Sequence, residues 1–391
     1  MAGPLFFALT LALFGTSIFS PAAMGQSSDS GLLSRIDAVF SAQTQPGEPG
    51  VAALVQKDGQ ILFAKGYGVR QLNSAVKIDP QTNFRLASVT KQFTAMAIML
   101  LVHGGKLHYE QHLTDIFPEF PGYGRPITIR NLLNHTSGLP DYSEIMEQQE
   151  KNGGSQWSPE HQIQDEDVLK LLEEQPVGEF APGTRWEYSN SGYVVLGLIV
   201  AKVSGMPYRE FLQRRIFAPL KMDHTVVYQN GINTVSDRAY GHSQENGKLV
   251  ETDQSATSAT LGDGGIYSNV TDMAKWDEGL RKHTLLSEKE MVSALTPVKL
   301  ADGSQPTWPR DPHSTDSDQP SPVFYGFGWF LDPYQGHARN YHDGGTLGFR
   351  TTIQRFTTDN FTVMVLSNRT DLDPQALSLK VADLLFVPRV H

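Results

Sequence analysis

The chain has 391 residues, of which 39% are hydrophobic and 19% are charged, proportions typical of a globular protein with a large core. Its formal net charge of −10 disfavours nucleic acid as a partner, because phosphate binding needs a basic face, so we expect no nucleic-acid partner. The absence of cysteine excludes disulfides, thiol nucleophiles and cysteine-bound metals.

The N-terminus is typical of a secretory signal peptide, although it carries no basic residue. An apolar run from Leu5 to Phe19 leads into small residues that end at Gly25. The run is short for a membrane span, which needs about 20 residues, so an anchor is the less favoured alternative. We expect residues 1–25 to be a signal peptide and residues 26–391 to form a secreted or periplasmic protein without a membrane span.

The predicted elements run from strands through helices and back to strands. A hairpin is expected around Asp58-Gly59, because that pair favours a two-residue turn between apolar runs. Helices are expected at about 30–42, 87–103, 191–204, 208–220 and 271–283 (capped by Thr271) and after Pro374, strands at about 325–332, 348–356 and 361–368, and surface loops at 148–167 and 301–321.

This order predicts an α+β fold in which one sheet domain is split by a helical insertion. The sheet lobe would comprise about residues 26–85 and 275–391, and the helical lobe about residues 86–274.

Ser88 and Lys91 form a Ser-x-x-Lys motif at the start of an apolar helix. Residues three apart on a helix share a face and lie about 5–6 Å from each other, so this lysine could take the proton of a nucleophilic serine. A pattern with two fixed letters also occurs by chance: Ser74 and Lys77 repeat it, but Pro80 disfavours a helix there. The motif alone therefore leaves an ordinary polar helix start open.

Two further motifs supply partners that an acyl-transfer site needs. Tyr188 and Asn190 precede the next apolar helix, and His342, Gly344 and Gly345 lead into a strand, where glycine would let a substrate approach the backbone. Isolated copies of these patterns occur at 228–230, 267–269 and 103–105, but without the same order and context.

In this order the three motifs resemble the serine β-lactamase and penicillin-binding-protein superfamily. The nearest branch is that of class C β-lactamases, D-Ala-D-Ala carboxypeptidases, D-aminopeptidases and family VIII carboxylesterases. Further similar segments are LLNHTSGLPDY from Leu132, FAPLKMDHT from Phe217, GDGGIYSN from Gly262 and YGFGW from Tyr325. The resemblance spans about residues 31–387 and implies an antiparallel sheet flanked by helices, with an inserted helical lobe and the site between the two.

The resemblance also implies a role for each motif residue. Ser88 would be the nucleophile, and Lys91 and Tyr188 would carry protons, in an order that such sites leave open. Asn190 would bind the substrate amide or Lys91. The backbone N–H groups of Ser88 and Gly345, beside Gly344, would form an oxyanion hole, and His342 would hold a substrate carboxylate or relay a proton.

These roles describe an exported serine hydrolase that forms an acyl-enzyme on an amide or ester bond, without a metal or organic cofactor. Because His342 stands where β-lactamases usually have lysine, we favour a D-Ala-D-Ala carboxypeptidase-like or esterase-like activity on a small-molecule or peptidoglycan-type substrate. A class C-like β-lactamase and a non-turnover β-lactam sensor or scaffold stay open as alternatives. The sequence leaves the oligomeric state open.

Three neighbouring residues have ordinary structural interpretations. We expect Asp343 to point away from the cleft as a surface charge, since a strand alternates its faces. His135 is expected to bond a loop, and Tyr142 either lines the cleft or packs in the core. An α/β-hydrolase or zinc site is disfavoured, because neither Gly-x-Ser-x-Gly nor His-Glu-x-x-His occurs.

Overall fold

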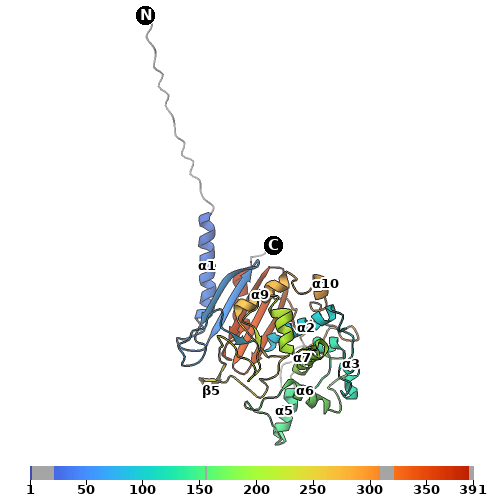
Figure 1. The fold of residues 1–391 in the computed structure, drawn as a ribbon. Coiled ribbons are helices and arrows are strands. Elements are labelled where there is room, and N and C mark those ends of the chain that lie inside the picture. Colours follow the sequence, from blue (N-terminus) through green and yellow to red (C-terminus); the bar gives the residue numbers. More distant parts are fainter. Residues whose placement is uncertain (2–21, 155, 309–320, 387–391) are drawn as a thin grey trace.

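The computed structural model describes residues 1, 22–154, 156–308 and 321–386. The predicted signal peptide, residues 1–25, lies mainly outside these residues, and so does most of the predicted loop at 301–321. Figure 1 shows a sheet with helices on both of its faces and a larger group of helices beside it.

The main sheet has five strands in the order β2-β1-β10-β9-β8, and every neighbouring pair is antiparallel. Its strands are β1 (Val51–Lys57), β2 (Gln60–Tyr67), β8 (Arg339–Thr346), β9 (Phe349–Phe356) and β10 (Phe361–Ser367). Two segments from opposite ends of the sequence therefore build one sheet, and the predicted α+β class with an antiparallel sheet is confirmed.

The predicted hairpin joins β1 and β2. Asp58 and Gly59 have φ of 51° and 76°, the two positive values that a tight primed turn needs. A one-residue shift in register follows between Val55 and Gln56. The turn residues thus set the pairing of β1, which is central to the sheet.

Alternate residues of β1 enter two different cores, so both faces of the sheet are covered. Val51, Ala53 and Val55 pack with α1 (Ala22–Ser41) and α11 (Pro374–Leu385). Ala52 and Leu54 join the larger core on the opposite face, where α9 (Val270–Arg281) lies. This two-residue period explains why β1 reads as a continuous apolar run.

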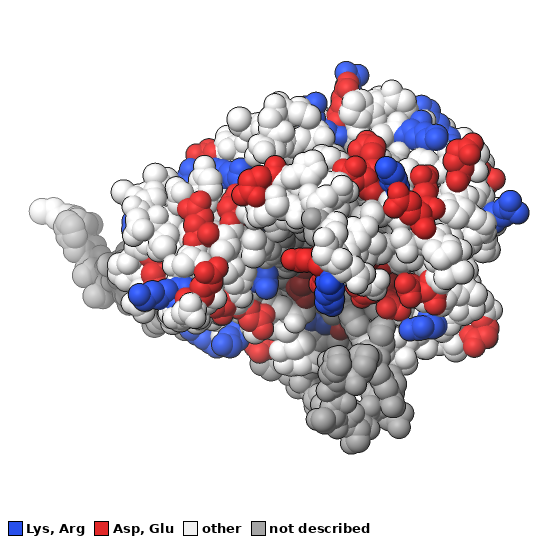
Figure 2. All heavy atoms as spheres, turned by 90° about the horizontal axis from the view of Figure 1, so that it is seen from below, with Lys and Arg blue, Asp and Glu red and all other residues white. Residues whose placement is uncertain are grey.

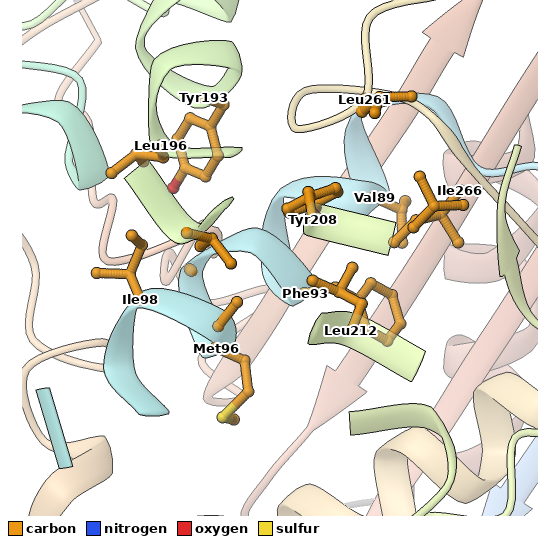
Figure 3. Packing of buried hydrophobic residues seen from close by; sticks show 14 of the residues in the cluster. Val89, Phe93, Met96, Ile98, Tyr193, Leu196, Tyr208, Leu212, Leu261 and Ile266 are labelled. Atoms are coloured by element: carbon orange, nitrogen blue, oxygen red, sulfur yellow. The ribbon is translucent and has the colours of Figure 1, made fainter. Parts of the chain in front are cut away.

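The larger core continues between helices that connect the two parts of the sheet. Figure 3 shows Phe93 of α2 beside Leu212 of α8, with Tyr208 of the same helix and Tyr193 of α7 nearby. The helices here are α2 (Lys91–His103), α3 (Leu113–Ile116), α4 (Ile129–Leu133), α5 (Tyr142–Lys151), α6 (Asp165–Glu173), α7 (Asn190–Ser204), α8 (Tyr208–Leu212), a π-helical continuation (Gln213–Phe217) and α10 (Glu288–Met291).

Short elements complete the framework. Two small sheets are formed by β3 (Phe84–Arg85), β7 (Ile266–Ser268) and β4 (Val226–Val227), and by β5 (His242–Glu245) with β6 (Lys248–Glu251). The 3₁₀ turns are η1 (Ala87–Thr90) and η2 (Gly122–Gly124).

Three sequence predictions of local structure are wrong. The loop predicted to begin at 148 overlaps α5, which continues to Lys151. This helix begins after Asp141, which caps it by accepting from Ser143 N at 2.9 Å. The segment 325–332 makes isolated bridges rather than a strand. Asn269, not Thr271, caps α9.

In the described part of the chain no single helix is both long and apolar enough to cross a membrane. By length and composition alone one pair would pass, α7 with Tyr208–Phe217, which is bent by 77°.

Gly344 lets strand β8 lie directly against η1. A Cβ at this position would lie 2.2 Å from the Leu86 carbonyl oxygen and 2.3 Å from Thr351 Oγ1, distances that no side chain tolerates. At Gly345 a Cβ would meet only the Arg350 side chain, whose nearest atom, Nη1, would be 3.6 Å away. The two glycines thus differ in steric demand, although they are adjacent.

We therefore expect Gly344→Ala to destabilise the protein by about 1–3 kcal/mol, because β8 or η1 must move apart. Gly345→Ala is the matched control and should change the stability by less than about 1 kcal/mol. Urea unfolding of both variants measures the difference, and equal stabilities would mean that β8 and η1 do not pack this closely.

Candidate active site

Ser88 lies in η1, between β3 and the buried helix α2. Leu86 N donates to Ile266 O at 2.8 Å, which ties the entry of the turn to β7. Ala87 then adopts φ of 48°, a left-handed conformation that is uncommon for a residue with a side chain. This local strain turns the chain so that Ser88 is half-buried at the start of α2.

Lys91 is fully buried and donates three hydrogen bonds from Nζ. The acceptors are Ser88 Oγ at 3.1 Å, Asn190 Oδ1 at 2.8 Å and the main-chain oxygen of Asp263 at 3.1 Å. Among the described residues none of these acceptors is a carboxylate. The predicted pair is therefore assembled, with the lysine directed at the serine hydroxyl.

Asn190 is the first residue of α7, which begins one residue earlier than the sequence predicted. Ser189 caps the helix by accepting from Gly192 N at 3.1 Å, and Ser189 N donates to His135 Nδ1 at 3.1 Å. Of the two partners expected for Asn190, the structure shows Lys91. His135 bonds this turn, as predicted, and so holds Tyr188 and Asn190 in place.

Tyr188 is close to Lys91 but bonded to neither Lys91 nor Ser88. Lys91 Nζ lies 4.9 Å from the centroid of the Tyr188 ring. Within 22–154, 156–308 and 321–386 no hydrogen bond joins the Tyr188 hydroxyl to either residue. Catalytic hydrogen bonds often tighten only when substrate binds, so the lack of such a bond here is compatible with proton transfer by the Tyr188 hydroxyl.

His342 is buried on β8 and faces the same centre. Its ring lies 6.2 Å from that of Tyr188, and its Nε2 is 3.2 Å from the Tyr325 hydroxyl. Because Nδ1 lies 2.7 Å from the carbonyl of Asp343, we assign the proton to Nδ1 and the acceptor role to Nε2. Burial, and then the charge of Lys91, lowers the pKa of His342 to about 3, so this imidazole is neutral at physiological pH.

Asp343 faces away from the cleft, as predicted, but it is not a surface charge. It accepts hydrogen bonds from Thr352 Oγ1 at 2.5 Å and from Gln375 Nε2 of α11 at 2.6 Å. Burial raises the pKa of its carboxyl to about 6. The α11 helix covers this face of the sheet, a packing that strand alternation alone does not reveal.

Ser88, Asn190 and Gly345 border a cavity of about 110 Å³. The sequence prediction missed several of its walls: Arg85, Thr257, Thr260, Asp263 and Gly264. Tyr142 is among the lining residues and also packs in the larger core, so both places considered for it apply. Ser88 and Gly345, whose N–H groups are expected to form the oxyanion hole, therefore border the same cavity.

The charges on the face of the molecule drawn in Figure 2 are mixed. Figure 2 shows Asp and Glu side chains interspersed with Lys and Arg around a hollowed centre. In the described chain, no group of three or more His, Asp or Glu side chains is placed to hold a metal ion.

Comparison with known proteins gives matches over most of the chain. The Beta-lactamase family model matches residues 36–387. Penicillin-binding protein 4* of Bacillus subtilis (strain 168) is 32% identical over 345 residues, which cover 84% of this chain and 70% of that protein. The putative penicillin-binding protein PbpX of the same strain is 29% identical over 314 residues, covering 80% and 69%.

Solved structures agree with these sequence matches. The octameric penicillin-binding protein homologue from Pyrococcus abyssi has a TM-score of 0.72 at 25% identity and covers 94% of this chain and 77% of its own. A D-amino acid amidase from Ochrobactrum anthropi SV3 has a TM-score of 0.73 at 23% identity, with coverages of 91% and 97%. The second match bears on the fold only.

The lowered pKa of His342 predicts acid sensitivity. The unfolded chain binds a proton at the ordinary pKa of 6.5, whereas the folded imidazole does so only at about 3. The free energy of unfolding should therefore fall as the pH drops below 6.5, by about 1.4 kcal/mol per pH unit for this group.

His342→Gln should remove that contribution and make the dependence between pH 6.5 and 4 shallower. His108→Gln, on the surface, serves as the matched control. Urea unfolding at several pH values measures both slopes. Parallel curves for the wild type and His342→Gln would show that His342 is not held neutral by the fold.

Proposed function

The chain belongs to the β-lactamase family and is a serine hydrolase, and from this premise we propose that Ser88 is its nucleophile and forms an acyl-enzyme on an amide or ester bond. The observation that carries the proposal is the hydrogen bond of 3.1 Å between Lys91 Nζ and Ser88 Oγ. Lys91 has no carboxylate partner among the described residues. The contact places the Lys91 amine where it can exchange a proton with the serine hydroxyl.

In the acylation step Ser88 Oγ attacks the substrate carbonyl carbon while Lys91 or Tyr188 takes the hydroxyl proton. The negative charge on the carbonyl oxygen is stabilised by the N–H groups of Ser88 and Gly345, where one donor is worth on the order of 10²–10³ in rate. The proton is returned to the leaving group as the tetrahedral intermediate collapses. Water then hydrolyses the ester on Ser88, with the same groups moving the proton.

We further propose a D-Ala-D-Ala carboxypeptidase-like or esterase-like activity, with the ester or amide bond as the common feature. The neutral imidazole of His342 supports the esterase-like alternative in particular, because it supplies no fixed positive charge for a substrate carboxylate, which a β-lactam and a D-Ala-D-Ala peptide both carry. A hydrogen bond from a neutral group to an anion remains available, but it is weaker than an ion pair in the same place.

Penicillin acylation is the second candidate, and the similarity to penicillin-binding protein 4* favours it. The name of that relative describes binding of the drug. Slow hydrolysis of the acyl-enzyme would make this chain a β-lactam sensor, whereas fast hydrolysis would make it a class C-like β-lactamase. The lifetime of the adduct separates the two.

Export is proposed from the sequence alone. The apolar run from Leu5 to Phe19 is the supporting observation. The mass of protein recovered from the periplasm or medium of a host would report whether residues 1–25 have been removed.

The nucleophile is tested by intact mass after addition of penicillin G or a p-nitrophenyl ester. The wild type should gain the mass of the acyl group, and Ser88→Ala should gain nothing. Ser74→Ala is the matched control, because Ser74 begins the second Ser-x-x-Lys of the chain and bonds only locally, to Val76 N at 3.1 Å. An adduct on Ser88→Ala would refute the assignment.

The proton carriers are tested by Tyr188→Phe, which removes only the hydroxyl. We expect kcat/KM for a p-nitrophenyl ester to fall by about 10²–10⁴. Tyr228→Phe, from the second Tyr-x-Asn pattern, should retain wild-type activity. The wild-type rate should also rise from acid toward neutral or mildly alkaline pH, and full activity at pH 4 would contradict the roles of Lys91 and Tyr188.

A further inference from the structure

A second cavity, of about 350 Å³, lies at the end of the main sheet where its hairpins turn. Its wall is formed by four strands, β1, β8, β9 and β10, by the end of α9 with the turn after it, and by the region of α10. The residues that line it are different from those beside Ser88. This separate space has room for roughly ten water molecules or for a small organic molecule.

A row of polar side chains crosses the sheet at this cavity. Gln56 of β1 pairs with Thr362 of β10, Thr362 with Arg355 of β9, and Arg355 with Asn340 of β8. Residues paired across strands point to the same face of a sheet, and all four border the cavity. The next row on this face belongs to the larger core and includes Leu54, Met364 and Ile353. The face thus changes from apolar to polar where the cavity begins.

Arg355 has two unpaired donor groups at this cavity. Its Nε donates to Asp277 Oδ1 at 2.5 Å, and this is its only side-chain hydrogen bond within the described chain. Nη1 and Nη2 have no partner there and, unlike the unpaired Nη1 of Arg85, they are not closed off from solvent. Because the Arg355 side chain is only 12% exposed, these two groups are the part of it that a molecule in the cavity can reach.

Asp277 of α9 fixes the orientation of this guanidinium. The carboxylate is itself only 6% exposed, and its Oδ1 also accepts from Thr362 Oγ1 at 2.9 Å. The Arg355 guanidinium carbon lies 5.6 Å from the centroid of the Trp329 ring, which limits its movement further. With Nε occupied by Asp277, the Nη1 and Nη2 end of the fork is free, and its spacing matches the two oxygens of a carboxylate.

The unpaired polar atoms of the cavity are mainly donors. Besides the two Nη groups of Arg355, the amide nitrogen of Gln56 has no partner among the described residues and is open to solvent, although Gln56 as a whole is only 4% exposed. Asp277 Oδ2 is an unpaired acceptor in the same wall. A metal ion could not use the donors, whereas a ligand rich in acceptor oxygens could.

Apolar side chains form another part of the wall. Leu280 belongs to α9, and Leu295, which follows α10, is 37% exposed. An inorganic oxyanion would leave both leucines without a contact, whereas a carboxylate attached to an apolar body could cover them. Arg281 and Glu288 also border the cavity, but they carry opposite charges and Arg281 is paired with Glu278 at 2.7 Å.

We propose that this cavity is a second binding site, in which Arg355, fixed by Asp277, binds the carboxylate of a small organic acid whose apolar part contacts Leu280 and Leu295. This site is additional to the hydrolysis proposed at Ser88 and does not depend on it. The existing ion pair already holds the guanidinium in place, so binding requires little further ordering of the side chain.

The test compares 2-naphthoate with its neutral amide, 2-naphthamide, which has the same size and shape. Isothermal titration calorimetry of the wild type at pH 7 should give a Kd of about 1 mM or below for naphthoate. The amide should bind about 10-fold more weakly, because it cannot form the charge-assisted pair of hydrogen bonds with Arg355.

Two variants locate the bound acid. Arg355→Lys keeps a positive charge beside Asp277 but removes the planar fork, and should weaken naphthoate binding by about 10-fold. Leu295→Trp narrows the cavity from an exposed position and should weaken the binding of both compounds. Arg350→Lys is the matched control on the same strand, because Arg350 donates to Thr346 O and Phe349 O at 2.8 Å and does not border this cavity. It should retain the wild-type Kd.

Several results would overturn the proposal. These are an equal Kd for the acid and the amide, no binding of naphthoate up to about 10 mM, or equal losses in Arg355→Lys and Arg350→Lys. Inorganic phosphate that binds more tightly than naphthoate, and loses affinity in Arg355→Lys, would overturn the organic acid in favour of an inorganic oxyanion. If Arg355→Lys does not fold, the acid–amide difference together with Leu295→Trp decides.

Discussion

The burial of one ammonium group, that of Lys91, is the constraint on which the site depends. Its three acceptors come from η1, from the start of α7 and from the loop before β7. An amine removed from water must have its donors satisfied, so these three segments have to meet at Nζ. The hydroxyl of Ser88, the amide of Asn190 and the wall of the cavity beside them are thereby brought together. The fold of the helical region thus determines the chemistry of the serine.

Two histidines near Lys91 are held in the neutral form. Burial lowers the pKa of both His135 and His342, and the charge of Lys91 acts in the same direction. Each histidine can then hold a neighbour with a neutral ring, His135 the turn before α7 and His342 the Tyr325 hydroxyl. Few groups of the site are therefore charged. A charge on a substrate would interact strongly with these few groups.

Local sequence rules were sufficient where the relevant contacts are local. The turn at Asp58-Gly59 and the Ser88–Lys91 spacing follow from backbone preferences and helix geometry. The place of Asp263 in the site could not be predicted in this way, because it involves a hydrogen bond from Tyr142, which is 121 residues away. Likewise, α11 covers Asp343 through Gln375, a contact that strand alternation cannot predict. The only sequence signal for Asp263 was its place in the similar segment GDGGIYSN.

The second Ser-x-x-Lys of the chain shows that the spacing alone does not bring the lysine to the serine. Ser74 accepts from Val76 N and Lys77 is exposed, so the amine there stays in water and has no reason to approach the hydroxyl. The motif at Ser88 and Lys91 lies inside a core instead. Gly344 allows β8 to pack against η1, and α7 packs against α2. The contact between Lys91 and Ser88 is therefore a property of packing around the motif, and we expect a change that loosens β8 from η1 to weaken the proposed catalysis without touching Ser88 or Lys91.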